Sequence, residues 1–466
     1  MSKIPKNNDR LRVVELFAGV GGFRIGLERA SKRYDTVWAS QWEPASGKVQ
    51  HAAWTYIQAI FKSNGASKNT IAKGFSNVDI NKVVADPKEI EQIPDHEILT
   101  GGFPCQDYSV ARPASQAKGL EGKKGVLWWS IYKILKHKID KKKPVKYLFL
   151  ENVDRLLKSP TAKRGRDFAI MLSTLAELGY VVEWRVINAG EYGFPQRRRR
   201  IYIIGYHKST QLAKNAIASK DHIDWVTKRG IVAKAFPVLP TIEKSGFFGL
   251  HSLPEEITRN FQLQDPEGQI DHDAPFQNAG LMIEHRVHTV KTRPVTPKSM
   301  TTLGDVLQDE KDVPEQYYIP DKDVKRWEAQ KEAHKFERTS KSGHKYMYAE
   351  GALPFPDTIT KSSRTVITSE GGKTPTRFKH VVGVFQRKGY ARGRIINGKT
   401  YRYRRLTPIE LERLCMFDDD HTKFMCDPSK DLVSEVPDTK RAFFMGNALV
   451  VGVITGIGRE LAKRAE

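Results

Sequence analysis

The chain has 466 residues, of which 39% are hydrophobic and 28% are charged, and this composition excludes a disordered protein. No stretch approaches the roughly 18 continuous apolar residues of a membrane span, the polar N-terminus shows no secretory signal, and three cysteines are too few for a disulfide framework. The net charge of +23 indicates a polyanionic partner, nucleic acid rather than membrane, although a merely solvated basic surface is the alternative.

Strand and helix signals alternate through the first two hundred residues. The apolar run Leu11–Phe17 is followed by a glycine-rich turn and an amphipathic stretch, Phe23–Ala30. Asp167–Leu178 places apolar residues on one helical face, and Gly179 stands at the expected C-terminal stop. Further apolar, strand-like runs lie at 97–99, 145–150, 181–187 and 201–205. This alternation predicts an α/β fold with a largely parallel, doubly wound, Rossmann-like sheet.

The composition changes after Tyr206. Residues 207–403 are rich in Pro, Gly, Lys and Thr and predict a second, irregular domain, mixed or mostly β. A helix signal returns at Thr407-Pro408-Ile409-Glu410, a capping box with proline at the first helical position. We therefore expect domains at 1–206 and 207–403, a bracing segment at 404–444 and an apolar C-terminal segment at 445–466.

The first motif is Phe17-Ala18-Gly19-Val20-Gly21-Gly22, directly after the first strand. A strand, a glycine-rich turn and a helix form a nucleotide pocket, although a simple tight turn is the alternative. The spacing is not that of a dinucleotide-binding GxGxxG. Gln41-Trp42-Glu43 follows where a ribose-binding acid stands, and Asp79 ends a further strand where it can accept from an adenine amino group.

Three more motifs follow at strand ends. Cys105 comes directly after Pro104 in Gly102-Phe103-Pro104-Cys105-Gln106, although a lone cysteine is more often an inert core residue. Glu151 leaves a buried strand in Leu150-Glu151-Asn152-Val153, where it is either paired or functional. In Pro195-Gln196-Arg197-Arg198-Arg199-Arg200, alternate residues share a face, so that Arg198 and Arg200 can hold one carboxylate, base oxygen or phosphate.

Residues 371–409 contain no Asp or Glu but many basic side chains with interleaved tyrosines. This pattern indicates a face that binds a nucleic-acid duplex, with a soluble basic loop as the alternative, and charge alone does not separate DNA from RNA. Gly393–Thr400 matches the GxxxxGK[ST] phosphate-loop pattern. A basic strand follows it instead of a helix, so we expect no nucleoside triphosphate there.

Taken in order, these motifs resemble the DNA cytosine-5 methyltransferases of prokaryotic restriction–modification type. Arg405-Leu406-Thr407-Pro408, with Glu410 and Arg413, is similar to the motif that braces the family's recognition domain. Gly446-Asn447-Ala448-Leu449-Val450 is similar to the C-terminal motif that returns to the cofactor pocket. Gln41 stands where many members have Glu, and Ala448 where Ser is common.

The resemblance implies roles for individual residues. Cys105 is the expected nucleophile, Glu151 the proton donor to the base, Arg200 the anchor of the base oxygen and Arg198 a second anchor. S-adenosylmethionine, with S-adenosylhomocysteine as product, is expected at Phe17, Gly19, Gly21, Gly22, Gln41, Trp42, Glu43, Asp79, Ile80, Pro104, Leu127, Asn447 and Ala448. DNA contacts are expected at Gln106, Ser109, Arg377, Lys379, Arg387, Arg392, Arg394, Arg404 and Arg405.

The expected activity is methyl transfer to C5 of a flipped-out cytosine in a specific sequence of double-stranded DNA. We expect a monomer in the bacterial cytoplasm, with no metal and no membrane partner, and a cognate restriction endonuclease is compatible with the sequence. One rival is an RNA cytosine-5 methyltransferase with the same catalytic domain, against which the long basic central region argues. The other is a catalytically silent DNA- or S-adenosylmethionine-binding regulator, which is expected to lose Cys105 or Glu151.

Overall fold

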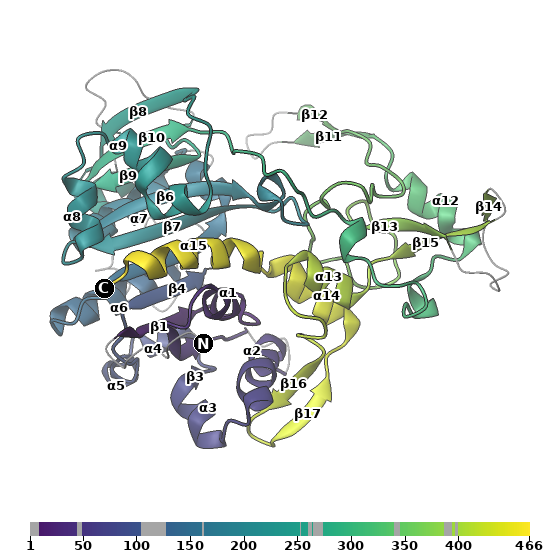
Figure 1. The fold of residues 1–466 in the computed structure, drawn as a ribbon, viewed down its shortest axis with the longest axis horizontal. Coiled ribbons are helices and arrows are strands. Elements are labelled where there is room, and N and C mark those ends of the chain that lie inside the picture. Colours follow the sequence, from purple (N-terminus) through teal and green to yellow (C-terminus); the bar gives the residue numbers. More distant parts are fainter. Residues whose placement is uncertain are drawn as a thin grey trace.

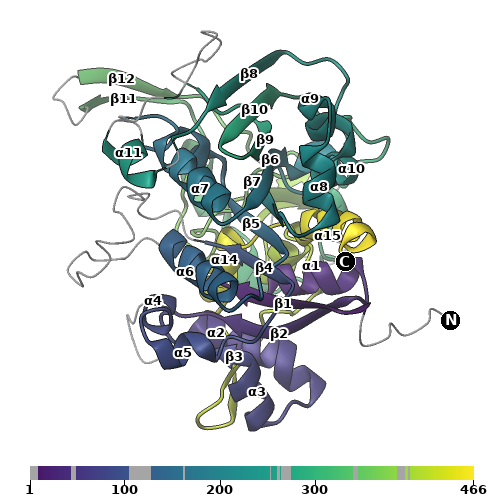
Figure 2. The ribbon, with the colours of Figure 1, turned by 90° about the vertical axis from the view of Figure 1, so that its left-hand side faces the viewer.

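The computed structural model describes residues 9–43, 49–103, 127–160, 163–251, 253–259, 263, 274–339, 345–385, 394–396 and 399–466. A large sheet flanked by helices forms one part of the molecule, and a smaller part extends from one end of it (Figure 1). Figure 2 shows the helices on both faces of the large sheet.

Seven strands form the half of the sheet that the sequence predicts, in the order β3-β2-β1-β4-β5-β7-β6. β1 to β5 are mutually parallel, and β7 pairs antiparallel with both β5 and β6. The Rossmann-like α/β class is confirmed, but the sheet is mixed. The strands are β1 (Leu11–Leu16), β2 (Tyr34–Ser40), β3 (Phe75–Ser76), β4 (Ile98–Gly102), β5 (Tyr147–Val153), β6 (Tyr180–Asn188) and β7 (Arg199–His207).

The sheet does not end where the sequence places the domain boundary. β8 (Lys244–Gly249), β9 (Ala279–Ile283) and β10 (Arg286–Lys291) extend it antiparallel beyond β6, to ten strands. The expected start of a second domain at residue 207 is therefore wrong, because residues up to Lys291 belong to the large sheet. We call the described residues of 301–405 the small domain.

Two apolar cores cover the two faces of the sheet. Alternate residues of β1 divide between them, since Leu11 and Val13 face one core and Val14 and Leu16 the other. The first core includes α1 (Gly22–Ala30), α2 (His51–Tyr56) with the π-helix η2 (Ile57–Phe61), α8 (Gln211–Ile217), α10 (Ile231–Ala235) and α15 (Val451–Arg464). The second includes α4 (Ile80–Val83), α5 (Pro87–Glu91), α6 (Leu127–Asp140), α7 (Arg166–Glu177) and α11 (Pro254–Arg259).

The expected helix at 167–178 is confirmed within one residue as α7, and Gly179 follows it with a φ of +80°. The shorter helices around the sheet are η3 (Lys62–Asn64), α3 (Lys68–Gly74), η5 (Asp154–Lys158), η6 (Ala189–Tyr192), α9 (His222–Asp224) and the π-helix η7 (Trp225–Arg229).

The small domain has its own core around Ile319, Trp327 and Val381. Its elements are η8 (Gly304–Val306), η9 (Glu315–Tyr317), α12 (Asp321–Ala329), the pair β11 (His334–Thr339) and β12 (Lys345–Glu350), and a sheet of β13 (Val381–Phe385), β15 (Lys399–Arg405) and β14 (Arg394–Ile396). The chain then returns through α13 (Pro408–Leu414), the hairpin β16 (Phe424–Asp427) and β17 (Leu432–Glu435), and α14 (Asp438–Asn447). The predicted capping box at Thr407 and Glu410 is present.

Within the described ranges, no single helix is long and apolar enough to cross a membrane. The bent pair α14 and α15 passes on length and composition together. In this fold, most of the apolar residues of α15 are buried in the first core.

Candidate active site

The glycine-rich turn after β1 forms an open cradle at the carboxyl ends of the parallel strands. Phe17, Gly19 and Gly21 have positive φ values, which turn successive backbone groups toward one side. A Cβ built on Gly19 would meet nothing within 4 Å, so this part of the turn faces open space. Gly22 begins α1 and packs against Leu449, where a Cβ would lie 3.0 Å from the leucine side chain.

The residues after β2 support this cradle. Gln41 Oε1 accepts the backbone N–H of Gly19 at 2.8 Å, so the glutamine that replaces the family's acid holds the turn itself. Trp42 is exposed, and Glu43 Oε2 accepts the N–H of Ala52 in the first turn of α2. Of Gln41, Trp42 and Glu43, only Glu43 carries a carboxylate that can bind a ribose.

The other described residues that the sequence predicts at the cofactor before the C-terminal motif are Asp79, Ile80 and Leu127. Asp79 caps α4 by accepting the N–H of Asn81 at 3.0 Å, and Ile80 is buried behind it. Leu127 begins α6 and packs partly buried against the second core. The Asp79 carboxylate thus caps α4, in addition to the predicted contact with an adenine amino group.

The C-terminal motif lies beside the same turn. Asn447 is the exposed last residue of α14, and Ala448 is partly buried against the first core. Nearby, His421 Nε2 donates to the Val20 carbonyl at 2.7 Å, and burial lowers the pKa of its ring, which favours the neutral form with the proton on Nε2. Of the motif itself, Leu449 contacts the turn at Gly22, whereas a cofactor role for Asn447 and Ala448 stays a prediction.

A nucleotide-like cofactor fits this arrangement. The cradle offers backbone N–H groups at a helix N-terminus and open space at Gly19, and strand-end carboxylates stand beside it. Among the residues that the structure describes, no group of three His, Cys, Asp or Glu side chains is arranged to hold a metal ion.

Glu151 and Arg200 form an ion pair at the adjoining edge of the sheet. Arg200 Nε lies 3.0 Å from Glu151 Oε1, and the two side chains are 17% and 12% exposed. Burial raises the pKa of the Glu151 carboxyl above its ordinary value, although Arg200 and then Arg198 oppose the shift. A carboxyl in this state can be both proton donor and hydrogen-bond partner.

The chain segment that leads to Cys105 passes directly beside this pair. Gly102 is the register partner of Glu151, and a Cβ on Gly102 would lie 3.3 Å from Glu151 Oε2. Asn152 Nδ2 donates to the Phe103 carbonyl at 3.0 Å and so fixes the last described residue before the expected nucleophile. Pro104, Cys105, Gln106 and Ser109 lie outside the described residues.

Arg198 does not share the open position of Arg200. It is 2% exposed, and its two terminal nitrogens donate to the carbonyls of Val366 at 3.1 Å and Gly446 at 2.8 Å. Burial, followed by the charge of Arg200, lowers its pKa to about 10. The expectation that Arg198 anchors a base or phosphate is therefore wrong, because these donors already link the small domain to the C-terminal motif.

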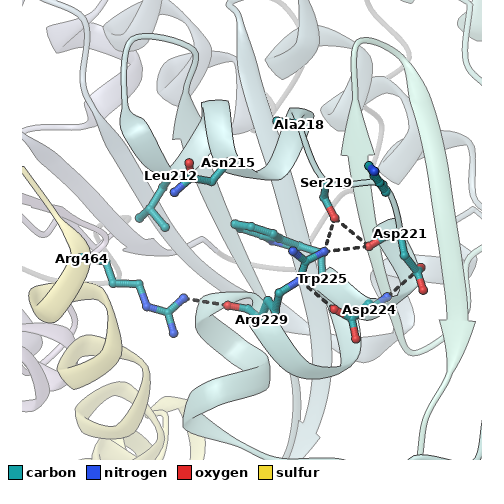
Figure 3. Close-up of a pocket in the computed structure, with 10 residues that line it drawn as sticks. Leu212, Asn215, Ala218, Ser219, Asp221, Asp224, Trp225, Arg229 and Arg464 are labelled. Atoms are coloured by element: carbon teal, nitrogen blue, oxygen red, sulfur yellow. Dashed lines mark hydrogen bonds and ion pairs between the residues drawn. The ribbon is translucent and has the colours of Figure 1, made fainter.

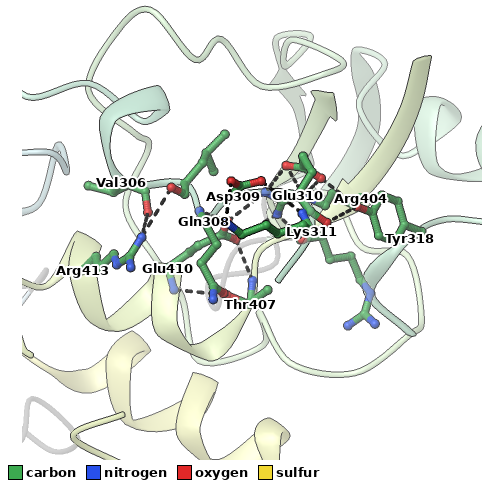
Figure 4. A network of polar contacts seen from close by, with 12 residues as sticks. Val306, Gln308, Asp309, Glu310, Lys311, Tyr318, Arg404, Thr407, Glu410 and Arg413 are labelled. Atoms are coloured by element: carbon green, nitrogen blue, oxygen red, sulfur yellow. Dashed lines mark hydrogen bonds and ion pairs between the residues drawn. The ribbon is translucent and has the colours of Figure 1, made fainter. Parts of the chain in front are cut away.

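Several basic residues expected on the DNA-binding face are internal. Arg404 is fully buried and pairs with Glu310 and Glu410 at 2.7 and 2.8 Å (Figure 4). Arg405 is 7% exposed and donates to the carbonyls of Gly372 and Gln316. Both expected DNA contacts are wrong, because acids from outside the acid-free interval and backbone carbonyls already bind these groups.

The same correction applies to two residues before β13. Lys379 is 4% exposed and donates to the carbonyls of Gly372 and Thr374. Arg377 pairs with Glu350 at 2.9 Å, and its side chain is 11% exposed. Arg387 and Arg392 lie outside the described residues, and of Arg394 only its place in β14 is described.

The phosphate-loop pattern is a hairpin, since β14 and β15 pair antiparallel across it. Three buried polar residues are not among the predicted site residues: Asn152, Gln196 and Glu15. The Gln196 amide bonds to the Val366 N–H and the Leu414 carbonyl, and Glu15 is a buried acid whose neighbour Leu16 ends β1. The first two stood inside quoted motifs, whereas an acid in an apolar strand was the available signal for Glu15.

A cleft of about 710 Å³ between α8, η7 and the end of α15 lies elsewhere (Figure 3). Leu212, Trp225, Arg229 and Arg464 line it. The cleft lies near α8, which follows the last residue of β7, His207, whereas Arg200 is at the start of that strand. The cleft is therefore separate from the Glu151–Arg200 site.

Comparisons with known proteins agree with this geometry. Residues 11–463 match the family model for C-5 cytosine-specific DNA methylases. The type II methyltransferase M.Sau3AI of Staphylococcus aureus is 39% identical, covering 98% of this chain and 96% of that protein. M.SsoII of Shigella sonnei is 38% identical over 44% of this chain and 45% of its own length.

Solved structures agree on the fold alone. The Dnmt2 methyltransferase of S. pombe superposes with a TM-score of 0.54 and 17% identity, covering 98% of this chain and all of that one. A DNMT2 mutant of Spodoptera frugiperda gives a TM-score of 0.52 with 13% identity, covering 97% and 99%. With a family match from the first strand almost to the end of the last helix, the chain belongs to the C-5 cytosine-specific DNA methylases, of the type II restriction–modification kind.

Proposed function

We propose that this chain methylates C5 of a cytosine flipped out of a specific duplex DNA sequence, through a covalent bond between Cys105 and C6. The observation that carries the proposal is the Glu151–Arg200 pair beside Gly102, two residues before Pro104-Cys105. The pair supplies a proton donor, Glu151, and a cation, Arg200, beside the strand end that leads to Cys105. Cys105 is the only cysteine of the sequence that stands in a Pro-Cys motif.

The chemistry needs covalent activation, because cytosine C5 is a poor nucleophile. The Cys105 thiolate adds to C6 while Glu151 gives a proton to N3, which leaves C5 as an enamine carbon. Arg200 orients the Glu151 carboxyl and holds the base O2. Because the reacting atoms are inaccessible in a duplex, the base must leave the helix, which costs a few kcal/mol.

S-adenosylmethionine, the methyl donor that family membership implies, supplies an electrophilic methyl group when bound and leaves as S-adenosylhomocysteine. In this proposal, the Gly19 turn and Glu43 bind it, with Asn447 closing the pocket from the C-terminal side. After methyl transfer, a base removes the C5 proton, the C6–sulfur bond breaks and releases the Cys105 thiolate, and N3 returns its proton to Glu151. We place the reaction on DNA in the bacterial cytoplasm, by a monomeric enzyme.

A suicide substrate tests the covalent step. Fluorine at C5 cannot leave as a cation, so duplex DNA with 5-fluorocytosine in the target should trap the enzyme only when S-adenosylmethionine is present. The complex should survive denaturing electrophoresis and map by peptide analysis to Cys105. Cys105→Ser should abolish trapping and turnover, because a hydroxyl is far less ionised than a thiol near neutral pH.

Cys426→Ser is the matched control, because Cys426 lies in β16 of the distant hairpin and should be dispensable. An adduct on Cys415 or Cys426, or full activity of Cys105→Ser, would overturn the mechanism. Methyl transfer to tRNA in preference to duplex DNA would instead identify an RNA methyltransferase.

A further inference from the structure

A buried chain of three polar side chains joins distant parts of the small domain. Ser363 Oγ lies 2.9 Å from His380 Nε2, and His380 Nδ1 lies 2.7 Å from Glu370 Oε1. The exposed fractions of Ser363, His380 and Glu370 are 2%, 1% and 6%. The order serine, histidine, acid is that of a hydrolase triad. Its burial leaves no access for a substrate, so its role is structural or positional.

The serine belongs to a segment that lies beside the turn before Arg200. Ser363 donates its N–H to the Pro195 carbonyl at 2.7 Å, and Arg197 donates its N–H to the Ser363 carbonyl at 2.8 Å. Ser363 and Gln196 form a parallel β-bridge. The small domain is thus joined to residues 195–198, which we call the catalytic turn, by backbone hydrogen bonds and not only by side-chain packing.

The same segment also contacts the C-terminal motif. A Cβ on Gly446 would lie 2.2 Å from the Thr368 nitrogen, so only glycine allows this approach. Arg198 donates to Val366 on one side and Gly446 on the other. Residues 363–368 therefore lie between the turn that leads to Arg200 and the motif that carries Asn447.

The polar chain holds this segment from the interior of the small domain. Glu370 Oε2 also accepts the His380 N–H at 2.9 Å, so both carboxylate oxygens are bonded. Asp357 and Arg364 form a second buried pair at 2.7 Å. Burial alone would raise the pKa of Asp357, but His380 and Arg364 bring it below its ordinary value. A fully bonded buried network fixes one geometry more strictly than apolar packing does.

We propose that Ser363, His380 and Glu370 are positioning residues for methyl transfer, which dock the small domain on the catalytic turn and so align the target base with Glu151 and Arg200. This inference rests on the proposed function, because it assigns the small domain to the DNA target. The three residues touch neither DNA nor cofactor, and they act through Pro195–Arg198.

The test compares His380→Gln and Ser363→Ala with His207→Gln. His207 is a matched control, because its ring also bonds a serine, Ser209, at 2.8 Å but at the far end of β7. The single-turnover methylation rate at saturating DNA should fall about tenfold to a hundredfold in the first two variants, since small misplacements of reacting groups have effects of this size. The dissociation constants for DNA and S-adenosylmethionine should change little, and His207→Gln should keep the wild-type rate.

Backbone hydrogen exchange gives a readout that needs no activity. The N–H groups of Arg197 and Val366, which bond across the junction, should exchange faster in Ser363→Ala and His380→Gln but not in His207→Gln. Unchanged exchange and unchanged rate in folded Ser363→Ala and His380→Gln would overturn the inference, as would a rate loss explained by weaker DNA binding. A wild-type protein that methylates no cytosine would instead refute the proposed function. Hydrogen exchange at Arg197 and Val366 would then alone decide whether the Ser363–His380–Glu370 network holds the small domain on residues 195–198.

Discussion

Substitution of Arg404 tests whether this residue stabilises the fold from the interior or contacts DNA. Its guanidinium donates to Glu310, in the segment that follows η8, and to Glu410, in the first turn of α13 (Figure 4). Glu410 also accepts the backbone N–H of Thr407 in the capping box. Both neighbouring acids raise the pKa of Arg404, against the effect of its burial. Arg404→Met removes the charge but keeps an unbranched side chain of similar reach.

The expected effect is large because two carboxylates lose their partner. Arg404 and Glu410 have side chains that are 0% exposed, and breaking a buried pair by removing one member costs about 3–5 kcal/mol. A surface contact would behave differently, since an exposed ion pair contributes about 0–1 kcal/mol. Loss of one phosphate contact would instead lower the slope of log affinity against log salt by about 0.9.

Urea unfolding and salt-dependent DNA binding separate these outcomes. Arg404→Met should lower the urea midpoint strongly, Arg404→Met/Glu410→Gln should recover part of the loss, and the salt slope should stay at the wild-type value. Arg199→Met is the control, because Arg199 is 61% exposed and its pair with Asp154 is near the surface. An Arg404→Met protein as stable as wild type but with a smaller salt slope would refute the stabilising role of Arg404 in the interior.

Three other outcomes follow from the site. Burial raises the pKa of Glu15 to about 7 from an ordinary 4.5, so the folded state holds a proton that the unfolded state loses. Stability should therefore fall by on the order of 3 kcal/mol as pH rises from about 4.5 to 7, and Glu15→Gln should remove this dependence in pH-resolved unfolding. Glu151→Gln should reduce the single-turnover methylation rate by about 10²-fold or more, since general acid catalysis contributes 10²–10⁴-fold; a wild-type rate would exclude Glu151 as the proton donor. S-adenosylmethionine should raise the melting temperature of the wild-type protein, and calorimetry without binding, with or without DNA, would contradict the cofactor site.

Local signals in the sequence predicted the elements around the site well. The apolar face of α7, the glycine turn after β1 and the capping box at Thr407 depend on residues within a few positions of one another. The extension of the sheet by β8, β9 and β10 depends on antiparallel pairing of β9 with β6 and of β8 with β10, between segments far apart in the sequence. Residues 207–291 therefore looked irregular in composition although they complete the large sheet.

The role of each arginine was the least predictable part of the candidate site. Arg198 and Arg200 are two residues apart, yet one donates to buried carbonyls and the other pairs with Glu151. The acid-free interval 371–409 predicts Arg404 on a DNA face, although Glu410 follows it six residues later. Its other partner, Glu310, is 94 residues away, and only the fold brings the two charges together. Charge composition reports how many cations a segment carries, but not which of them already have a partner.

The packing of α15 on α1 also constrains how the polypeptide folds during synthesis. Gly26 and Ile454, and Leu27 and Gly458, approach so closely that the two helices share one interface. Tyr34 at the start of β2 donates to the Gly458 carbonyl as well. A growing chain on the ribosome exposes this apolar side of α1 until residues 451–464 have emerged, more than 400 residues later. The first core of the large sheet is therefore completed only after translation of α15, and until then the exposed side of α1 is a surface that chaperones can bind.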